Sequence, residues 1–358
     1  MKIIHTGDVH LGSVFGGLPK DRAAIRQAEL LDGFRRLCAY AKEIGVTAVL
    51  LAGDLFDGDK VPRSLYQEAF SAIAQANPVC FFYISGNHDE GLALQEKPSN
   101  LYLFSQNRGW ASYDLPENIT VTGIDGKNLT PASYAQLCLR AERFNILMMH
   151  GDIYHADGVD GISLPHLQNR NVDYLALGHI HIPNMQAERL DGRGKYRYCG
   201  CLEGRGFDEV GKRGFFLLDI QNGKVTKEEF LTFSRREIVE RAVDISACRS
   251  YYDVEKTTLD GLSGVRREDT VKVILQGRHS AGLKKDIPLL TARLSQNFFH
   301  VKVVDEAKIT IDFAAFQNDL SERGEFVREV GRYAMNEEDR AEILDVGLKA
   351  LAGEEIDL

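Results

Sequence analysis

Short apolar runs alternate with polar and helix-like segments along residues 1–233. This alternation is typical of an α/β fold, in which strands build a sheet and helices cover its faces. Apolar residues at Leu30, Phe34, Leu37 and Ala41 also recur with a helical period, so we expect an amphipathic helix at residues 20–44. The apolar runs predict strands at residues 2–7, 46–51, 79–85, 119–124, 144–149, 173–178, 195–200, 214–220 and 225–233.

The pattern changes near residue 235, where a charged segment at residues 234–256 interrupts the strand rhythm. We therefore predict a boundary there, with one domain at residues 1–235 and a smaller accessory α/β domain at residues 236–358. In the second domain we expect a strand at 270–276, a helix at 282–297, one strand or a hairpin at 299–312, and two terminal helices. A chain of 358 residues is long enough for two such domains.

The composition is that of a soluble globular protein, with 44% hydrophobic and 27% charged residues. No apolar run is long enough to span a membrane. The chain starts directly with a strand-like segment, Lys2 to Thr6, without the regions of a signal peptide. The six cysteines lie mostly in apolar segments, as reduced core residues do. We therefore expect a cytoplasmic protein that does not associate with membranes.

The net charge of −9 argues, at face value, against a protein dedicated to binding nucleic acid. The charge is unevenly distributed, however. Residues 337–358 contain eight acidic and two basic residues, so they account for −6 of the total. The rest of the chain is close to neutral, and the charge neither supports nor excludes a nucleic acid substrate.

Five predicted strands are followed at once by side chains that bind metals. In open α/β sheets, ligands gather beyond the carboxyl ends of the strands, so five such ends would bring these side chains together at one edge. A single His after a strand is more often an ordinary loop residue. Here, however, five of the ten histidines fall inside these segments. The segments contribute Asp8 and His10, then Asp54, then Asn87, His88 and Asp89, then His150, and finally His179 and His181.

The chemistry of this set indicates divalent cations. Carboxylate and amide oxygens with imidazole nitrogens suit Mn²⁺, Fe²⁺ or Zn²⁺, and the absence of thiolates makes a closed structural zinc site a poor fit. Two cations ~3.5–4 Å apart need a bridging carboxylate to offset their repulsion, and Asp54 is our candidate. The glycines that precede the ligands are expected to let the backbone turn where each strand stops. They are Gly7, Gly53, Gly86 and Gly178.

His88 and Arg205 are candidates for roles outside metal binding. His88 cannot easily reach the same metal as its neighbour Asn87, so we expect it to protonate the leaving oxygen or to stabilise the transition state. Asp89 would then fix the tautomer of His88. Arg205 stands in a glycine-rich loop, where it could meet a substrate phosphate or be an ordinary exposed residue of a turn.

In order and residue type, the five segments resemble the calcineurin-like metallophosphoesterases, whose pattern is D-x-H, GD, GNH(D), H and GHxH. Four segments are similar, more narrowly, to the bacterial SbcD-type exonuclease subunit and its YhaO-like relatives: Asp8–Ser13, Gly53–Asp57, Tyr198–Gly200 and Gly206–Glu209. The similarity covers nearly all of residues 1–233. Cys201 stands where such chains usually have Ser, and Asp57 stands where archaeal and eukaryotic relatives have a second catalytic His.

The resemblance implies a fold and a ligand set. The fold is a metallophosphoesterase β-sandwich flanked by helices, in four α/β/β/α layers, with a small C-terminal α/β capping domain. The two metals would share Asp54. One would be held by Asp8, His10, Asp54 and His181, and the other by Asp54, Asn87, His150 and His179.

The function that we expect is a Mn²⁺-dependent DNA repair nuclease. The sequence has no G-x-x-x-x-G-K-[ST] loop, so an SbcC-type ATPase would be a separate partner. A homodimer through helices near residues 20–44 and 62–76 is implied by the resemblance only. The same chemistry would also serve small phosphodiesters, nucleotides or phosphoproteins. A non-catalytic scaffold is a third hypothesis, but a scaffold should have lost metal ligands, and here none is missing.

Overall fold

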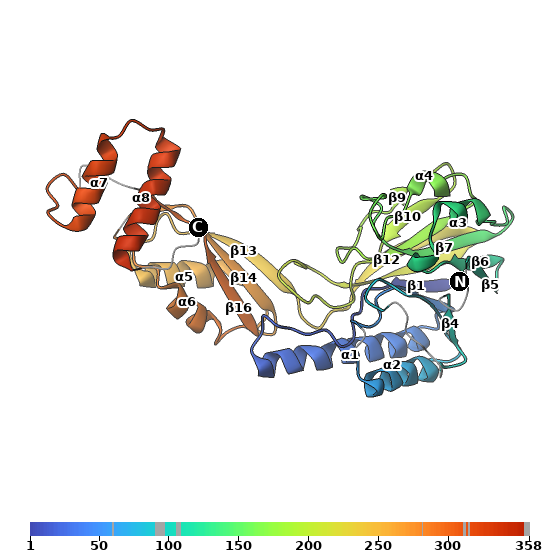
Figure 1. Cartoon of the computed structure of the whole chain (residues 1–358). Helices are drawn as coiled ribbons and strands as arrows, with labels where there is room; N and C mark the ends of the chain where they lie inside the picture. The colour runs from blue at the N-terminus through green and yellow to red at the C-terminus, as the bar shows by residue number, and fades with distance from the viewer. Residues whose placement is uncertain are drawn as a thin grey trace. The chain divides into compact units, whose positions relative to one another are not determined.

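The computed structural model describes residues 1–58, 61–89, 97–104, 109–280, 282–310, 313 and 316–353. The chain divides into two compact units, Met1–Glu237 and Ile238–Leu358. The first unit contains two six-stranded sheets, and each of the nine predicted strands overlaps one of their strands. Figure 1 labels helices and strands of both units along the chain. Among the described helices, none is both long enough and apolar enough to cross a bilayer.

The first sheet has the strand order β12-β11-β1-β2-β3-β4. Its strands β1 to β4 run parallel, while β11 and β12 are antiparallel to their neighbours. One apolar cluster joins this sheet to helices α1 (Lys20–Glu43) and α2 (Arg63–Gln75), so both helices cover its outer face. The strands are β1 (Lys2–Thr6), β2 (Ala48–Ala52), β3 (Cys80–Ile84), β4 (Leu101–Leu103), β11 (Gly214–Gln221) and β12 (Lys224–Thr232).

The second sheet has the order β5-β6-β7-β8-β10-β9. The short helices α3 (Pro131–Gln136) and α4 (Leu164–Leu167) cover its outer face, and η1 (Gly126–Asn128) precedes α3. A separate apolar cluster fills the space between the two sheets. The four-layer α/β/β/α prediction is therefore confirmed. The strands are β5 (Ala111–Leu115), β6 (Ile119–Gly123), β7 (Phe144–His150), β8 (Tyr174–Gly178), β9 (Glu188–Arg189) and β10 (Lys195–Tyr198).

The second unit begins with a parallel sheet, β13-β14-β16, whose strands are joined through helices α5 and α6. A short sheet of β15 and β17 follows, and helices α7 and α8 pack on each other around Val327 and Leu344. The elements are β13 (Ile238–Asp244), α5 (Tyr251–Gly261), β14 (Thr270–Gln276), β15 (Arg278–Ser280), α6 (Ile287–Leu294), β16 (His300–Asp305), β17 (Lys308–Thr310), α7 (Glu322–Arg332) and α8 (Glu337–Ala352).

Two details predicted for this unit are wrong. The charged segment 234–256 contains a strand, β13, which pairs in parallel with β14 along its whole length and buries Val239 and Val243. The segment 299–312 is neither one strand nor a hairpin, because β17 pairs with β15 instead of with β16. Residues 311 and 312 of that segment lie outside the described residues.

Strand direction brings the predicted ligands to one edge of the sandwich. Strands β1, β2 and β3 run parallel in the first sheet, and β7 and β8 run parallel in the second. The ring Nδ1 of His150, the last residue of β7, lies 2.8 Å from the carbonyl oxygen of Ala52, the last residue of β2. The carboxyl ends of the two sheets therefore meet, and the residues that follow them share one site.

Candidate metal centre

The structure brings together all seven predicted ligands, which we call the ligand cluster. Each follows a strand directly or ends it, so the strands set the position of each side chain. Asp8 and His10 follow β1, Asp54 follows β2, Asn87 follows β3, His150 ends β7, and His179 and His181 follow β8.

Asp54 lies at the centre of the ligand cluster. Its Oδ2 is 3.6 Å from His10 Nε2 and 3.5 Å from His150 Nε2, so one carboxylate oxygen sits between imidazoles from the two sheets. The other oxygen, Oδ1, accepts a hydrogen bond of 2.9 Å from the backbone N–H of His88. The side chain is almost fully buried. This placement fits a carboxylate that two cations would share.

The remaining ligands divide into two groups on either side of Asp54. On one side, His10 Nε2 lies 3.1 Å from His181 Nε2, and that nitrogen of His181 lies 3.8 Å from Asp8 Oδ1. On the other side, Asn87 Oδ1 lies 3.1 Å from His150 Nε2 and 3.3 Å from His179 Nδ1. The pairs in each group are close enough for one cation to contact several donor atoms.

Electrostatics favour a positive charge at this position. Asp8 is fully buried, and burial together with the neighbouring charge of Asp54 raises the pKa of Asp8 well above its usual value. Burial lowers the pKa of His150 to about 4, so its imidazole is neutral at neutral pH. A buried pair of carboxylates beside neutral imidazoles is costly without a counter-ion and offers several lone pairs to a cation.

Hydrogen bonds outside the ligand cluster set two imidazole tautomers. His150 Nδ1 lies 2.8 Å from the carbonyl oxygen of Ala52, and His181 Nδ1 lies 2.6 Å from Glu209 Oε1. An oxygen partner of this kind accepts a hydrogen bond from Nδ1–H and so keeps the ring proton on Nδ1, which leaves the lone pair of Nε2 directed at the cluster. The donor atoms therefore fit divalent cations, in agreement with the residue types.

The backbone is strained at the ligands themselves. Four of them have a positive φ angle, in the left-handed region that residues other than glycine rarely adopt: Asp8 at 48°, His10 at 51°, Asp54 at 50° and His179 at 101°. Residues in this region cluster at functional sites, where the surrounding structure imposes the conformation. The expectation that the preceding glycines make the turns holds only for Gly53, with a φ of 96°.

Glycine is also required at Gly86 and Gly53 because other groups approach these two positions closely. A Cβ added at Gly86 would lie 2.0 Å from Asp54 Oδ1, and one added at Gly53 would lie 2.1 Å from His150 Nδ1. A Cβ never comes this close to a neighbouring atom, so a side chain at either position must displace a ligand of the cluster.

Gly86→Ala is therefore expected to lose metal and turnover while the fold survives. The added methyl group would push Asp54 away from the two imidazoles it lies between. Elemental analysis after Mn²⁺ loading and hydrolysis of bis-p-nitrophenyl phosphate measure the effect. Gly192→Ala is the matched control, because a Cβ there meets no atom within 4 Å. Wild-type metal content in Gly86→Ala would contradict the geometry.

One predicted role is wrong: Asp89 does not fix the tautomer of His88. The Asp89 carboxylate is buried and accepts hydrogen bonds from Gly86 N at 2.6 Å and Leu55 N at 2.7 Å, and from the Tyr83 hydroxyl. It thus holds the loops after β2 and β3 together. Asp89 fails as a partner because its two oxygens are turned into the protein, away from the half-exposed His88 ring.

Asp57 takes the place that was predicted for Asp89. Its Oδ1 lies 2.7 Å from His88 Nδ1 and 3.5 Å from His10 Nδ1. Hydrogen bonding from His10, together with that from Ser13, holds the pKa of Asp57 well below its usual range, so the carboxylate is charged at neutral pH. Sequence reasoning noted Asp57 only as a departure from related chains; its position three residues after Asp54 was the available signal.

Glu209 is a second residue that sequence reasoning left without a role. It is buried, and besides its bond to His181 it accepts a hydrogen bond of 2.6 Å from the backbone N–H of Arg205. Burial opposes its charge, but the His181 hydrogen bond and the nearby Arg205 guanidinium lower the pKa of Glu209 to about 2. The acid that closes the segment Gly206–Glu209 was the signal for this role.

Arg205 lies beside the ligand cluster. Its Nη1 is 3.1 Å from Ser13 Oγ and 3.7 Å from Asp57 Oδ2, and its Nη2 is 3.4 Å from Glu209 Oε1. The side chain is only 20% exposed, so it is not an ordinary residue of an exposed turn. The guanidinium sits among acids that also contact His88 and His181.

Three groups of His and acidic side chains within the described residues are close enough to hold a metal ion. Two of them belong to the ligand cluster: Asp8 with His10 and His181, and Asp8 with Asp54 and His150. The third consists of His10, Asp57 and His88. A substitution at His88 distinguishes a ligand from a proton donor at this position.

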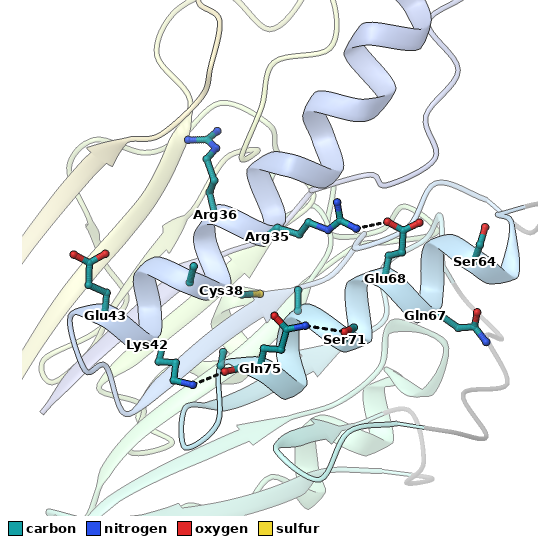
Figure 2. Close-up of a pocket in the computed structure, with 13 residues that line it drawn as sticks. Arg35, Arg36, Cys38, Lys42, Glu43, Ser64, Gln67, Glu68, Ser71 and Gln75 are labelled. Carbon is teal, nitrogen blue, oxygen red and sulfur yellow. Dashed lines mark hydrogen bonds and ion pairs between the residues drawn. The ribbon is translucent and has the colours of Figure 1, made fainter.

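A pocket of about 920 Å³ lies elsewhere, between α1 and α2 (Figure 2). Arg35 and Glu68 form an ion pair across it, and Lys42 donates a hydrogen bond of 2.7 Å to the carbonyl oxygen of Gln75. None of the residues that line it belongs to the ligand cluster.

Comparison with known proteins gives one family and several relatives. Residues 1–183 match the family model described as calcineurin-like phosphoesterase. The chain is 27% identical to the metallophosphoesterase YhaO of Bacillus subtilis over 304 residues, which cover 77% of this chain and 72% of YhaO. It is 28% identical to the SbcD component of the nuclease SbcCD from Escherichia coli K12, covering 64% of this chain and 68% of that protein. It is also 28% identical to the DNA double-strand break repair protein Mre11 of Aeropyrum pernix, and the match covers 82% of this chain and 75% of that protein.

Proposed function

Because this chain belongs to the calcineurin-like phosphoesterases and is thus a metal-dependent hydrolase, we propose that it cleaves phosphodiester bonds of DNA at a two-metal centre. The observation that carries the proposal is the position of Asp54, whose single oxygen Oδ2 lies 3.6 Å and 3.5 Å from imidazoles of two different sheets.

The ligand cluster would hold two cations that share Asp54. Asp8, His10 and His181 would complete one set, and Asn87, His150 and His179 the other. We propose Mn²⁺ for both, with Fe²⁺ or Zn²⁺ as alternatives, since the donor atoms suit all three. When bound, such a pair supplies a water nucleophile near neutral pH and offsets the charge that grows on the phosphoryl oxygens.

His88 is placed to move a proton in this reaction. Its side chain is 44% exposed, and its Nδ1 lies 2.7 Å from the charged carboxylate of Asp57. Asp57 keeps the proton on Nδ1 and stabilises the imidazolium, so Nε2 can give its proton to the leaving oxygen. We propose that Arg205, beside Asp57, binds a phosphoryl oxygen of the substrate.

Two observations support DNA over a small substrate. Relatives at 28% identity are named as a nuclease component and a DNA double-strand break repair protein. In addition, residues 238–358 form a second compact unit beyond the catalytic sandwich, which a small-molecule phosphatase does not need.

An SbcC-type ATPase is the partner that we propose, because the relative from Escherichia coli is named as one component of SbcCD. We place its docking region in the second unit, where Leu320, Tyr333, Ile343 and Leu351 are exposed apolar residues.

We also propose that a second copy of this chain binds at helices α1 and α2, which are drawn in Figure 2. Sedimentation as a monomer at micromolar concentration would contradict the homodimer, and failure to co-purify with the co-expressed ATPase would contradict the complex.

The substrate is tested with the purified chain in Mn²⁺ on linear duplex DNA and on bis-p-nitrophenyl phosphate. We expect hydrolysis of both, lost on addition of EDTA and restored by Mn²⁺. Activity on the small diester without activity on any form of DNA, alone or with the ATPase, would contradict the nuclease proposal and leave a small-diester phosphoesterase. Inactivity on both substrates would contradict the catalytic proposal itself.

A further inference from the structure

A buried network of charged side chains lies in the first unit beside the ligand cluster. Arg26 and Glu29 come from helix α1, Glu203 comes from the segment after β10, and Arg236 comes from the segment after β12. Arg26, Glu29 and Glu203 are 3%, 5% and 2% exposed. Charges this deeply buried are costly unless each is paired, so their contacts constrain the segments that carry them.

Glu29 lies between Arg26 and Arg236, which come from distant parts of the chain, and Arg235 Nε also lies 3.4 Å from its Oε1. Its Oε2 accepts a hydrogen bond of 2.5 Å from Arg26 Nη1 and one of 2.9 Å from Arg236 Nε. Its Oε1 accepts one of 2.6 Å from Arg236 Nη2. Arg236 therefore binds the carboxylate with two parallel hydrogen bonds, a geometry that a lysine cannot reproduce.

Arg26 connects Glu29 to the loop at residues 203–209. Its second nitrogen, Nη2, donates a hydrogen bond of 2.6 Å to the carbonyl oxygen of Gly204 and lies 3.7 Å from Glu203 Oε2. Glu203 Oε1 accepts a hydrogen bond of 2.8 Å from the backbone N–H of Arg235. Arg36 also lies 3.4 Å from that oxygen, and in Figure 2 its side chain points away from α2.

The 203–209 loop depends on these contacts because it has no regular structure of its own. No helix or strand is assigned between the end of β10 at Tyr198 and the start of β11 at Gly214, all of which the structure describes. The loop carries Arg205 and Glu209, and Glu209 holds the ring of the predicted ligand His181. A shift of the loop therefore moves a group that orients a ligand.

We propose that Glu29 is a positioning residue for the hydrolytic centre. Held between Arg26 and Arg236, it fixes the 203–209 loop so that Glu209 and Arg205 stay beside the ligand cluster. Because Arg236 stands two residues before the second unit, which starts at Ile238, the same contact ties the loop to the segment that leads into that unit. The effect on turnover rests on the proposed function, whereas the effect on loop order does not.

Arg236→Ala is the variant that tests this proposal in the full chain. Its side chain is 10% exposed. Its removal leaves Glu29 paired with Arg26 but takes away the two hydrogen bonds that anchor this pair to the segment before β13, so Arg26 is held less firmly against the loop. Substituting Glu29 would instead remove the buried carboxylate that Arg26 and Arg236 share, with a risk of misfolding. Arg236→Lys keeps the charge but only part of the hydrogen bonding, so we expect its results to lie between those of the wild type and those of Arg236→Ala.

Three readouts are compared with the wild type: amide hydrogen exchange, Mn²⁺ affinity from titration, and kcat and KM on bis-p-nitrophenyl phosphate. In Arg236→Ala we expect faster exchange confined to residues 203–209 and to the segment around residue 236. We also expect Mn²⁺ binding weakened by ~10-fold, the lower end of the range for disturbing a partner of a metal-binding histidine, because the loop positions Glu209 beside His181. We expect kcat to fall together with Mn²⁺ affinity. Arg140→Ala, which breaks an exposed ion pair with Asp114, is the control and should leave all three unchanged.

Unchanged exchange in the loop and unchanged Mn²⁺ affinity would overturn the proposal. A uniform rise in exchange across the first unit would also overturn it, since that result indicates general destabilisation. If the wild type hydrolyses no diester, the proposed function fails, but hydrogen exchange and Mn²⁺ affinity still decide whether Glu29 positions the loop.

Discussion

Asp54→Asn is expected to lose both cations and to abolish turnover. Asp54 Oδ2 lies 3.6 Å from His10 Nε2 and 3.5 Å from His150 Nε2, so the two proposed ligand sets would share this one oxygen. An amide lacks the negative charge that offsets the repulsion between two cations. The loss of turnover should exceed the ~10⁴-fold that removal of a general acid can cause. Elemental analysis after Mn²⁺ loading and hydrolysis of bis-p-nitrophenyl phosphate measure both effects.

The stability of the metal-free variant gives an independent check. The charge of Asp54 contributes to the raised pKa of Asp8, so the two buried carboxylates repel each other. Without metal, Asp54→Asn should therefore melt at the wild-type temperature or above it, whereas added Mn²⁺ should stabilise the wild type alone.

The matched control for this variant is Asp114→Asn, because Asp114 is exposed and paired with Arg140. It should keep both cations and full turnover. Retention of two cations by Asp54→Asn would show that another residue bridges them.

His88→Ala is expected to keep both cations and to lower kcat by ~10²–10⁴-fold, the range for a general acid. The side chain is 44% exposed, and its closest charged contact is Asp57 Oδ1 at 2.7 Å. Because p-nitrophenolate leaves readily without a proton, the loss should be larger on DNA than on bis-p-nitrophenyl phosphate. Asp57→Asn should reduce kcat in the same direction, since it removes the charge that stabilises the imidazolium.

Metal content distinguishes the two roles that the geometry allows for His88. His10, Asp57 and His88 are close enough to hold an ion, so loss of Mn²⁺ from His88→Ala would show that His88 is a ligand. An equal loss of kcat on both substrates would argue against proton donation. The matched control is His155→Ala. His155 is 82% exposed, and within the described part of the chain its one ion pair is with Asp152.

Most of the sandwich and the membership of the ligand cluster could be predicted from the sequence. Apolar runs such as those at β2 and β7 are buried along their whole length, and this pattern is visible without coordinates. A polar residue directly after such a run must lie at the carboxyl end of a strand. Parallel strands place those ends at one edge, so residues as distant as Asp8 and His181 converge there.

Short or half-exposed elements could not be predicted in the same way. Strands β4 and β9 have three and two residues, too few for a periodic pattern. Strand β17 pairs with β15, although β16 precedes it directly in the chain. Nothing in the residues of β17 favours one of these two partners, so the tertiary structure decides the pairing.

The sequence by itself determined which side chains reach the centre, because residue type and position at the end of an apolar run are local properties. Only the tertiary structure decided how those side chains are held. Asp57 faces His88 while Asp89 turns inward, and Glu29 joins Arg26 to Arg236 across about 200 residues of chain. Hydrogen-bond partners depend on side-chain direction and on left-handed backbone at positions such as Asp8 and His179, and neither is encoded in the spacing of apolar residues.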